Sequence, residues 1–187
     1  MAYFPMFISL EKKRCLVVGG GTVALRKVQV LLDFGADVVV VAPEVEKEIL
    51  SQENITIFLR EFEESDLDYC TLVIAATDHR DANHHIAEVA KAKGIAVNAV
   101  DQKEDCTFLF PSYIKEQNLV GAFSSGGNSP LLTQYLKREC SGILTKKLGE
   151  INECMGSIRD EVKENVPDEK MRKQVYEEIL RELFNKQ

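Results

Sequence analysis

Three consecutive glycines, Gly19, Gly20 and Gly21, have the spacing that most directly indicates chemistry in this sequence. They follow an apolar run over residues 15–18 and precede a helical pattern, which is the strand–turn–helix setting of a dinucleotide-binding fingerprint. In the frame Gly-x-Gly-x-x-Ala, Gly19 permits the tight turn, Gly21 lets the backbone approach a pyrophosphate, and Ala24 keeps the helix near the strand. The helix N-terminus adds amide donors and a dipole that favours an anion. The residues expected to bind the cofactor at this turn are Gly19, Gly20, Gly21, Thr22, Val23 and Ala24.

The position that usually grips the adenosine ribose departs from the common pattern. An acidic residue is expected at the end of the second strand, about 20 residues beyond the glycines. Ala42 and Pro43 occupy that place, Glu44 follows one position late, and no basic residue is there to receive a 2′-phosphate. We therefore expect NAD rather than NADP, with Pro43 and Glu44 at the ribose, although Glu44 also suits a helix start stabilised by the dipole. Thr77, after the fourth apolar run, and Asn98, on the fifth, are further cofactor-binding candidates; Asn98 can equally satisfy a sheet end.

Three histidines raise the question of a metal site. His84 and His85 are adjacent and face different sides of a predicted helix. His79 lies outside the spacing that places two ligands on one helix face. We predict no metal site built by the protein and interpret all three as surface histidines.

Composition limits the classes of partner. The 187-residue chain has a net charge of −7, which argues against a nucleic-acid surface and means that a polyanionic ligand needs a local basic patch. No apolar run is long enough to span a bilayer, and the N-terminus lacks the plan of a signal peptide. The five cysteines are scattered without a C-x-x-C pair, which indicates reduced thiols. We expect a cytoplasmic protein without nucleic-acid or membrane partners.

Apolar segments alternate with helical patterns along the first half of the chain. The predicted strands cover residues 15–18, 37–42, 55–59, 71–75 and 95–100. Helices are predicted after the glycines, over residues 44–50 and over residues 79–93. This rhythm indicates right-handed βαβ units in a Rossmann-type parallel sheet.

The rhythm changes in the second half. Residues 107–113 and 119–124 are predicted to pair as strands around residues 116–118, and a second glycine-rich loop follows. Ser129 and Pro130 suit the N-cap and first position of a helix, and the helical tail is broken at Pro167 and restarted by Asp168. The expected fold class is α/β, with an N-terminal Rossmann-type domain, a central α+β segment and a helical C-terminal domain.

Six motifs, in order, resemble those of the precorrin-2 dehydrogenase family, which is also the dehydrogenase/ferrochelatase module of siroheme synthase. They are Phe4-Pro5-Met6-Phe7, the glycine motif over residues 17–27, Ala75-Ala76-Thr77-Asp78, Val97-Asn98-x-Val100-Asp101, Phe108-x-x-Pro111-Ser112 and Ser124-Ser125-Gly126-Gly127-x-Ser129-Pro130. The resemblance covers essentially the whole chain. It implies NAD-dependent oxidation of precorrin-2 to sirohydrochlorin, a step toward siroheme. It also implies a homodimer whose chain has an NAD-binding domain (1–113), a dimerisation segment (114–145) and a helical C-terminal domain (146–187).

The resemblance also implies roles for particular residues. Asp101 matches the family's aspartate implicated in proton removal and metal insertion, and its place just beyond the fifth strand suits a base facing the nicotinamide. A turn or cap aspartate is the alternative interpretation. Precorrin-2 bears many carboxylates, and the second glycine loop offers backbone amides and a helix N-terminus to bind them. The expected substrate-binding residues are Ser124, Ser125, Gly126, Gly127 and Asn128, with Lys137 and Arg138 as further candidates.

Two other functions stay open at this point. The enzyme can be bifunctional and also insert Fe²⁺, relying on Asp101 and the nitrogens of the substrate. A regulatory NAD-binding module is the more remote alternative, because such modules usually have the acidic residue after the second strand that is missing here.

Overall fold

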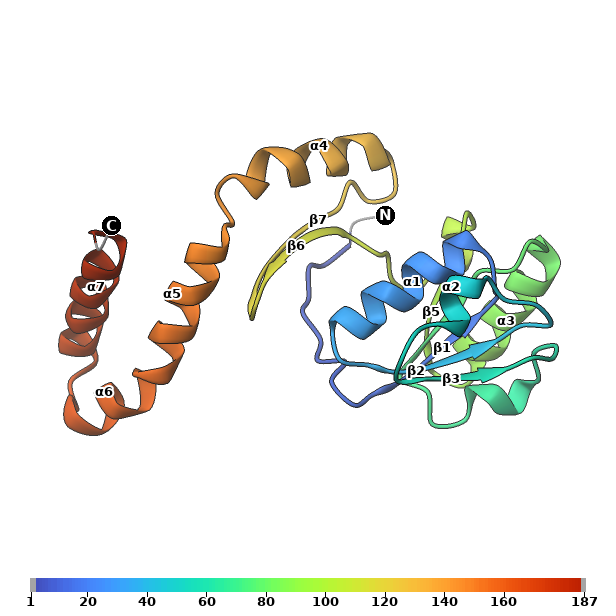
Figure 1. Ribbon diagram of the computed structural model, residues 1–187, viewed down its shortest axis with the longest axis horizontal. Helices are drawn as coiled ribbons and strands as arrows, with labels where there is room; N and C mark the ends of the chain where they lie inside the picture. Colours follow the sequence, from blue (N-terminus) through green and yellow to red (C-terminus); the bar gives the residue numbers. More distant parts are fainter. Residues whose placement is uncertain (1–2, 186–187) are drawn as a thin grey trace. The chain divides into compact units, whose positions relative to one another are not determined.

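The computed structural model describes residues 3–185 and divides the chain into two compact units, between Phe110 and Pro111 (Figure 1). The boundaries expected from the sequence lay after residues 113 and 145. Among the described residues, no helix has both the length and the apolar character needed to cross a membrane.

The first unit is built on a five-stranded parallel sheet with the order β3-β2-β1-β4-β5 (Figure 1). Its strands are β1 (Arg14–Val18), β2 (Asp37–Val41), β3 (Ile55–Phe58), β4 (Leu72–Ala75) and β5 (Ala96–Ala99). The five predicted strands are confirmed to within one residue at either end. Because the strand order reverses beside β1, the carboxyl edge of β1 and β4 is a topological switch point, where such sheets bind ligands.

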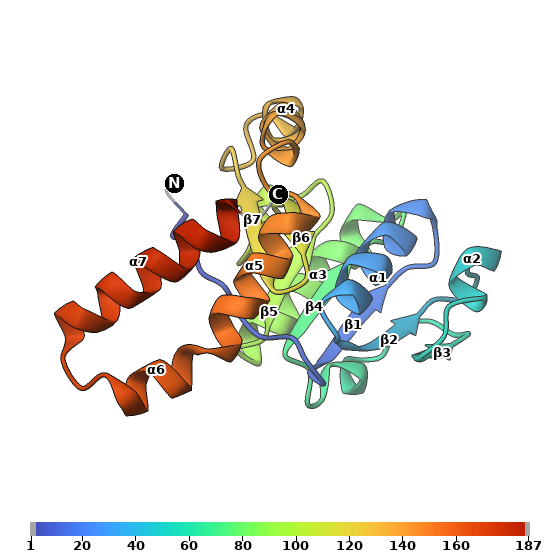
Figure 2. The same ribbon diagram turned by 60° about the vertical axis from the view of Figure 1, so that its left-hand side comes forward.

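Helices cover both faces of this sheet (Figures 1 and 2). On one face, α1 (Thr22–Asp33) and α2 (Lys47–Leu50) pack on alternate strand residues, including Cys15 and Val17. On the other, α3 (Arg80–Ala92) and the 3₁₀ turn η1 (Glu64–Leu67) pack on the residues between them. Burial on both faces explains why the strands are continuous β-branched and apolar runs.

The segment after β2 differs from the prediction. A helix was expected over residues 44–50, but α2 begins only at Lys47. The preceding residues form a loop over the glycine turn, where the Glu46 amide donates to the Gly20 carbonyl at 2.8 Å. Tertiary contact with that turn therefore replaces the first helical turn.

The second unit, as far as it is described (residues 111–185), contains one antiparallel hairpin and four helices. The elements are β6 (Ser112–Glu116), β7 (Leu119–Phe123), α4 (Pro130–Ser141), α5 (Lys146–Ser157), α6 (Arg159–Asn165) and α7 (Glu169–Asn185). The predicted helix starts are confirmed. The Ser129 hydroxyl accepts from the Leu132 amide at 3.2 Å, and the Asp168 carboxylate accepts from the Met171 amide at 2.8 Å.

The first predicted strand of the hairpin begins five residues too early. Residues 107–111 are not part of the hairpin, which starts at Ser112. Instead Thr107 is tied to the first unit, because its amide donates to the Val97 carbonyl at 2.8 Å and its hydroxyl accepts from the Val97 amide at 2.8 Å. The short 3₁₀ turn η2 (Lys103–Asp105) leads into this connection.

Candidate functional site

The glycine turn directly follows β1 and begins α1. Gly19 has a φ of +125°, and a Cβ there would lie 2.2 Å from the Ala76 carbonyl oxygen. A Cβ on Gly20 would lie 1.9 Å from the Glu44 carbonyl oxygen. A Cβ on Gly21, by contrast, would meet no atom within 4 Å. The first two glycines are therefore required by the packing of the loop itself, and the third leaves open space for a ligand.

The N-terminus of α1 is suited to an anion. Gly21 is its N-cap, no side chain caps it, and no acidic residue lies in its first turn. Its first amides and the positive end of the helix dipole are thus available to a phosphate. Thr22 is exposed and Val23 half-buried, whereas Ala24 is fully buried, so its part is to bring α1 close to the sheet.

A cavity of about 840 Å³ opens at the carboxyl edge of the sheet, against the glycine turn. Its lining comes from the ends of β1, β2 and β4, from the loop after β3 and from the start of α3. The predicted cofactor residues that line it are Gly19, Gly20, Gly21, Pro43, Glu44 and Thr77. The predicted residues outside its lining are Thr22, Val23, Ala24 and Asn98.

The charge of this cavity is negative. Glu44, Glu46, Glu61 and Asp78 line it, and none of its described lining residues is a lysine or arginine. The lining residues that the sequence analysis missed as site residues include Glu46, Glu61, Asp78, His79 and His85. The signal for Glu61 was available, because it follows β3, whose carboxyl end lies at the same sheet edge as those of β1 and β2.

Thr77 owes its position to a residue that the sequence analysis also missed. Asn83, on α3 and only 3% exposed, accepts from the Thr77 amide at 3.0 Å and from its hydroxyl at 2.7 Å. The Asn83 side-chain amide donates in turn to the Thr77 carbonyl at 3.0 Å. This ring of hydrogen bonds fixes the loop after β4 along the cavity wall.

Asp101 follows β5 in a conformation that its neighbours enforce. Its φ is +58°, a left-handed value that aspartate tolerates better than most residues, and its side chain is exposed. The Cys106 thiol lies 3.2 Å from the Ala99 carbonyl oxygen and 3.3 Å from that of Gln102. The Cys106 thiol, whose pKa is raised by burial, thus lies between both sides of the Asp101 turn and can donate to either carbonyl. Asp101 is thus an accessible carboxylate on a braced backbone.

Asn98 supports this region from within the protein. It is 7% exposed, and its side-chain amide donates to the Phe108 carbonyl at 3.0 Å. The same amide lies 3.5 Å from the Cys106 sulfur. Its observed contacts therefore hold the connection after β5, and its role at the cofactor stays a prediction.

The second glycine loop is held by its own serines. Gly126 and Gly127 have φ values of +64° and +81°. The Ser124 hydroxyl accepts from the Gly126 amide at 3.1 Å, and the Ser125 hydroxyl accepts from the Ser129 amide at 2.8 Å. The amide of the remaining predicted residue, Asn128, donates to the Ser125 carbonyl at 3.2 Å. The loop is therefore a preformed turn leading into α4.

His84 belongs to a polar cluster on the outside of the first unit. Its Nδ1 lies 2.9 Å from an Asp105 carboxylate oxygen, and this hydrogen bond raises the pKa of His84. His84, Glu88 and Asp105 bring potential ligand atoms within 4.8 Å of one another. The Lys91 ammonium, however, already lies 3.1 Å from Glu88 and 3.3 Å from Asp105. Both carboxylates of this cluster therefore have a lysine cation as a partner.

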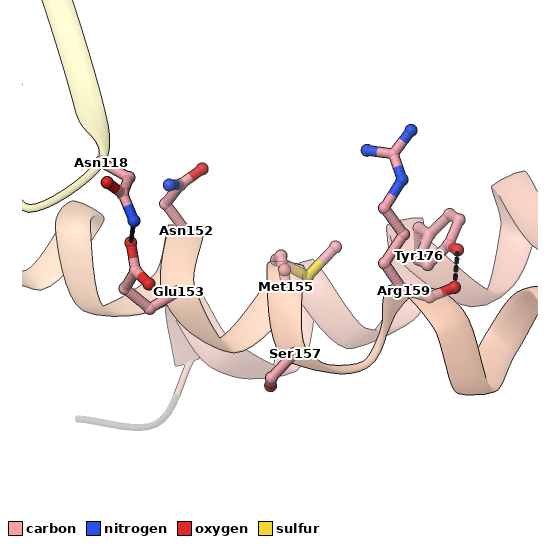
Figure 3. Close-up of a pocket in the computed structure, with 8 residues that line it drawn as sticks. Asn118, Asn152, Glu153, Met155, Ser157, Arg159 and Tyr176 are labelled. Carbon is pink, nitrogen blue, oxygen red and sulfur yellow. Dashed lines mark hydrogen bonds between the residues drawn. The ribbon is translucent and has the colours of Figure 1, made fainter. Parts of the chain in front are cut away.

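A smaller cavity of about 480 Å³ lies within the second unit, and Figure 3 shows its lining. There the Asn118 side-chain amide donates to Glu153 at 2.9 Å, and the Tyr176 hydroxyl donates to the Arg159 carbonyl at 3.1 Å. None of the predicted site residues lines it. Its hydrogen bonds connect the hairpin to α5, and α7 to the start of α6.

Comparison with known proteins finds a matching family model and similar sequences. A family model described as "Putative NAD(P)-binding" matches residues 6–112. The siroheme synthase of Thioalkalivibrio sulfidiphilus is 39% identical over 183 residues, which are 96% of this chain and 37% of that protein. The siroheme synthase of Pseudomonas entomophila is also 39% identical, over 96% of this chain and 40% of its own length. The chain thus spans less than half the length of these curated relatives.

A solved structure has the same fold. The protein titled "SirC, precorrin-2 dehydrogenase" superposes with a TM-score of 0.76 over 98% of each chain, at 24% sequence identity. This likeness agrees with the α/β architecture and its parallel sheet described above.

Proposed function

The chain belongs to this NAD(P)-binding family, and we propose that it oxidises precorrin-2 to sirohydrochlorin with NAD⁺ as the hydride acceptor. The observation that supports this most is the siroheme synthase similarity, which extends over 96% of the chain and so includes both units. The likeness to a structure titled precorrin-2 dehydrogenase over 98% of each chain agrees with it.

The negative cavity supports NAD over NADP. A 2′-phosphate on the adenosine ribose would meet Glu44, Glu46 and Glu61 without a basic partner in the lining. Like charges close together in a cleft repel, whereas ribose hydroxyls can donate hydrogen bonds to carboxylates. Glu44 is then the ribose ligand, one position later than in the common pattern, and Pro43 lies beside it.

Asp101 is the proposed base. Dehydrogenation removes a hydride and a proton from the substrate, and bound NAD⁺ supplies the hydride acceptor. The exposed Asp101 carboxylate accepts the proton from the substrate and becomes a neutral acid that solvent can deprotonate. The left-handed backbone and the Cys106 bridge fix the direction from which this carboxylate approaches.

The second glycine loop is the proposed partner for substrate carboxylates. Residues 124–128 form a turn with two consecutive left-handed glycines, and such turns can present amides to anions. The Gly126 and Asn128 amides already donate within the loop, so the remaining amides and the serine hydroxyls are the proposed donors. Lys137 and Arg138 are weaker candidates because both have local partners. The Lys137 ammonium lies 5.5 Å from the centre of the Tyr113 ring, and Arg138 lies 3.6 Å from Glu139.

A homodimer is proposed through the segment 114–145. The helix α4 exposes a row of large apolar side chains, and monomeric proteins seldom expose apolar rows of this kind to water. Its exposed members are Leu131 (79%), Leu132 (51%), Tyr135 (49%) and Leu136 (36%). A second copy of the chain is the occupant we propose. Light scattering should give a dimer for the wild type and a monomer for Leu131→Glu; a monomeric wild type would exclude this interface.

A cytoplasmic location is proposed as well, because the five cysteines are all free thiols in the structure, as a reducing compartment favours.

One assay tests the proposed activity. The protein is incubated with precorrin-2 and NAD⁺, and NADH and sirohydrochlorin are followed by absorbance. Asp101→Ala should lower turnover at least about a hundredfold, which is the usual contribution of a positioned base, and leave NAD⁺ affinity within about twofold. Glu104→Gln, an exposed carboxylate change nearby, is the matched control and should behave as wild type. The absence of NADH from the wild type would exclude the proposed function and favour a regulatory NAD-binding module.

The same assay tests the alternative that the enzyme is bifunctional and also inserts iron. Adding Fe²⁺ after sirohydrochlorin has formed should convert it faster than the non-enzymatic rate only if the protein also inserts iron. If Asp101→Ala removes that acceleration, the two activities share this carboxylate.

A further inference from the structure

Lys27 has an unusual position for a lysine on a surface helix. It lies on α1, one turn beyond Ala24, and its side chain is half-buried. Its ammonium nitrogen lies 3.9 Å from the centre of the Phe110 ring. Phe110 in turn packs against Phe108, with ring centres 5.4 Å apart, and both rings lie against the core on the α1 face of the sheet. An aromatic pair therefore holds this cation in place.

The charge of Lys27 has no counter-ion in the described part of the chain. Burial lowers the pKa of its ammonium, as does the neighbouring charge of Arg26, and the nearby Asp101 opposes this by raising it. Among residues 3–185, no carboxylate lies within ion-pair distance of the Lys27 nitrogen. Other half-buried lysines of this unit are paired: Lys91 bonds to Glu88 and Asp105. Lys27 is thus partly removed from water without receiving an anion from its own protein.

Such an arrangement is unfavourable unless something else supplies the anion. A desolvated cation loses hydration that a ring face only partly replaces. A flexible lysine would otherwise extend into water, but here its ammonium lies on the Phe110 ring, and Asp101 is near enough to raise its pKa. The net charge of −7 also means that an acidic ligand is repelled by most of the surface and needs a local cation.

We propose that Lys27 binds a carboxylate of the tetrapyrrole substrate and so places the substrate over Asp101. This inference rests on the proposed function and adds the residue that recognises the acidic periphery of the substrate. In this inference the Lys27 ammonium binds the substrate. The experiment must distinguish this role from a purely electrostatic effect of Lys27 on Asp101.

Three variants provide the test. Lys27→Met removes the charge and keeps an apolar stem on the Phe110 ring, and Lys27→Arg keeps the charge. Arg26→Met is the matched control, because it removes one positive charge from the adjacent, exposed position on the same helix. Circular dichroism and thermal melting first establish that each variant is folded; should Lys27→Met not fold, Lys27→Gln takes its place.

Binding and catalysis are then measured separately. Uroporphyrin, a stable polycarboxylate tetrapyrrole, is titrated with protein by fluorescence anisotropy, and steady-state kinetics with precorrin-2 and NAD⁺ follow. Lys27→Met should weaken uroporphyrin binding and raise the KM for precorrin-2 by about tenfold to hundredfold, as expected for a lost charge-assisted hydrogen bond. The kcat and the NAD⁺ affinity should stay within about threefold. Lys27→Arg should retain most binding, and Arg26→Met should resemble wild type.

Three results with the variants would overturn the inference. The first is unchanged uroporphyrin binding in Lys27→Met, and the second is an equal loss of uroporphyrin binding in Arg26→Met. The third is a lower kcat with unchanged binding in Lys27→Met, which would mean that Lys27 acts electrostatically on Asp101 instead. A wild type that binds uroporphyrin through Lys27 but forms no NADH would leave the binding role standing and reject the proposed dehydrogenase activity. A wild type that does not bind uroporphyrin would reject the binding role.

Discussion

Alanine substitutions at Gly20 and Gly21 should affect different properties, stability and NAD⁺ binding respectively, although the two glycines are adjacent. A Cβ on Gly20 would lie 1.9 Å from the Glu44 carbonyl oxygen and 2.8 Å from the Val45 Cα, both of which are backbone atoms. A Cβ on Gly21 would meet no protein atom within 4 Å. Gly20→Ala must therefore distort the free protein, whereas Gly21→Ala fills space that only a bound cofactor would use.

The magnitudes follow from these distances. In Gly20→Ala the loop around Glu44 must retreat by more than 1 Å to restore ordinary contact, and overpacking of this kind costs about 1–3 kcal/mol. Each kcal/mol lowers the melting temperature of a protein of this length by about 2–4 °C. Gly21→Ala should leave the melting temperature of the free protein unchanged. It should instead weaken NAD⁺ binding about tenfold to hundredfold, through the loss of a charge-assisted hydrogen bond between the turn and the pyrophosphate.

Thermal melting of the free proteins and titration with NAD⁺ test both effects on the same samples. Gly142→Ala is a control for the loss of a glycine, because a Cβ there also meets no neighbouring atom and Gly142 lies outside the cavity. Equal melting temperatures for the Gly20 and Gly21 variants would refute the packing argument. Wild-type NAD⁺ affinity in Gly21→Ala would refute the assignment of this turn to the pyrophosphate.

Three further predictions concern the support of the site and of the two units. Cys106→Ala should lower kcat about fivefold to tenfold without changing NAD⁺ affinity, since the bridge across the Asp101 turn is lost, and Cys106→Ser should recover most of the activity in steady-state assays. Hydrogen bonds from Arg60 hold the pKa of Asp66 below its usual value, so their stabilisation is complete above about pH 4 and is lost as the pH falls through the lower, folded-state pKa. Urea unfolding should accordingly show Asp66→Asn to be about 1–2 kcal/mol less stable than wild type at neutral pH, with a smaller difference near pH 3. Gly156→Ala, in α5 where a Cβ meets no atom, should raise stability by about 0.5–1 kcal/mol in the same measurement.

The sheet was predictable from the sequence because local signals and tertiary demands agree. Buried parallel strands need continuous apolar runs, and the first two runs end at Gly19 and Pro43, which do not continue a strand. Gly35 and Gly94 mark helix ends and have the positive φ values expected of such caps. The glycine turn could be placed for the same reason, since its frame encodes both the turn and the helix that follows.

The errors occur where tertiary contacts override local pattern. Residues 107–110 have the apolar and β-branched character of a strand, but Thr107 bonds to Val97 and so joins the sheet unit instead of the hairpin. Glu46 and Glu61 were missed because a fingerprint names the residues of one loop, whereas the cavity is lined by the ends of several strands. Lys27 could not be recognised from the sequence, because its isolation from counter-ions is a property of the folded chain.

The charged residues at the carboxyl edge of the sheet lie on different sides of the switch point, because they follow different strands. Glu44 and Glu61 follow β2 and β3, at one side of the switch point, whereas Asp101 follows β5 at the other. A dinucleotide whose pyrophosphate lies on the α1 N-terminus has its adenosine ribose on the first side and its nicotinamide on the second. In the proposed assignment, carboxylates on the ribose side oppose a 2′-phosphate, and Lys27 recognises the acidic substrate. Because different residues then select the cofactor and the substrate, Lys27→Met should change substrate affinity without changing the preference for NAD⁺.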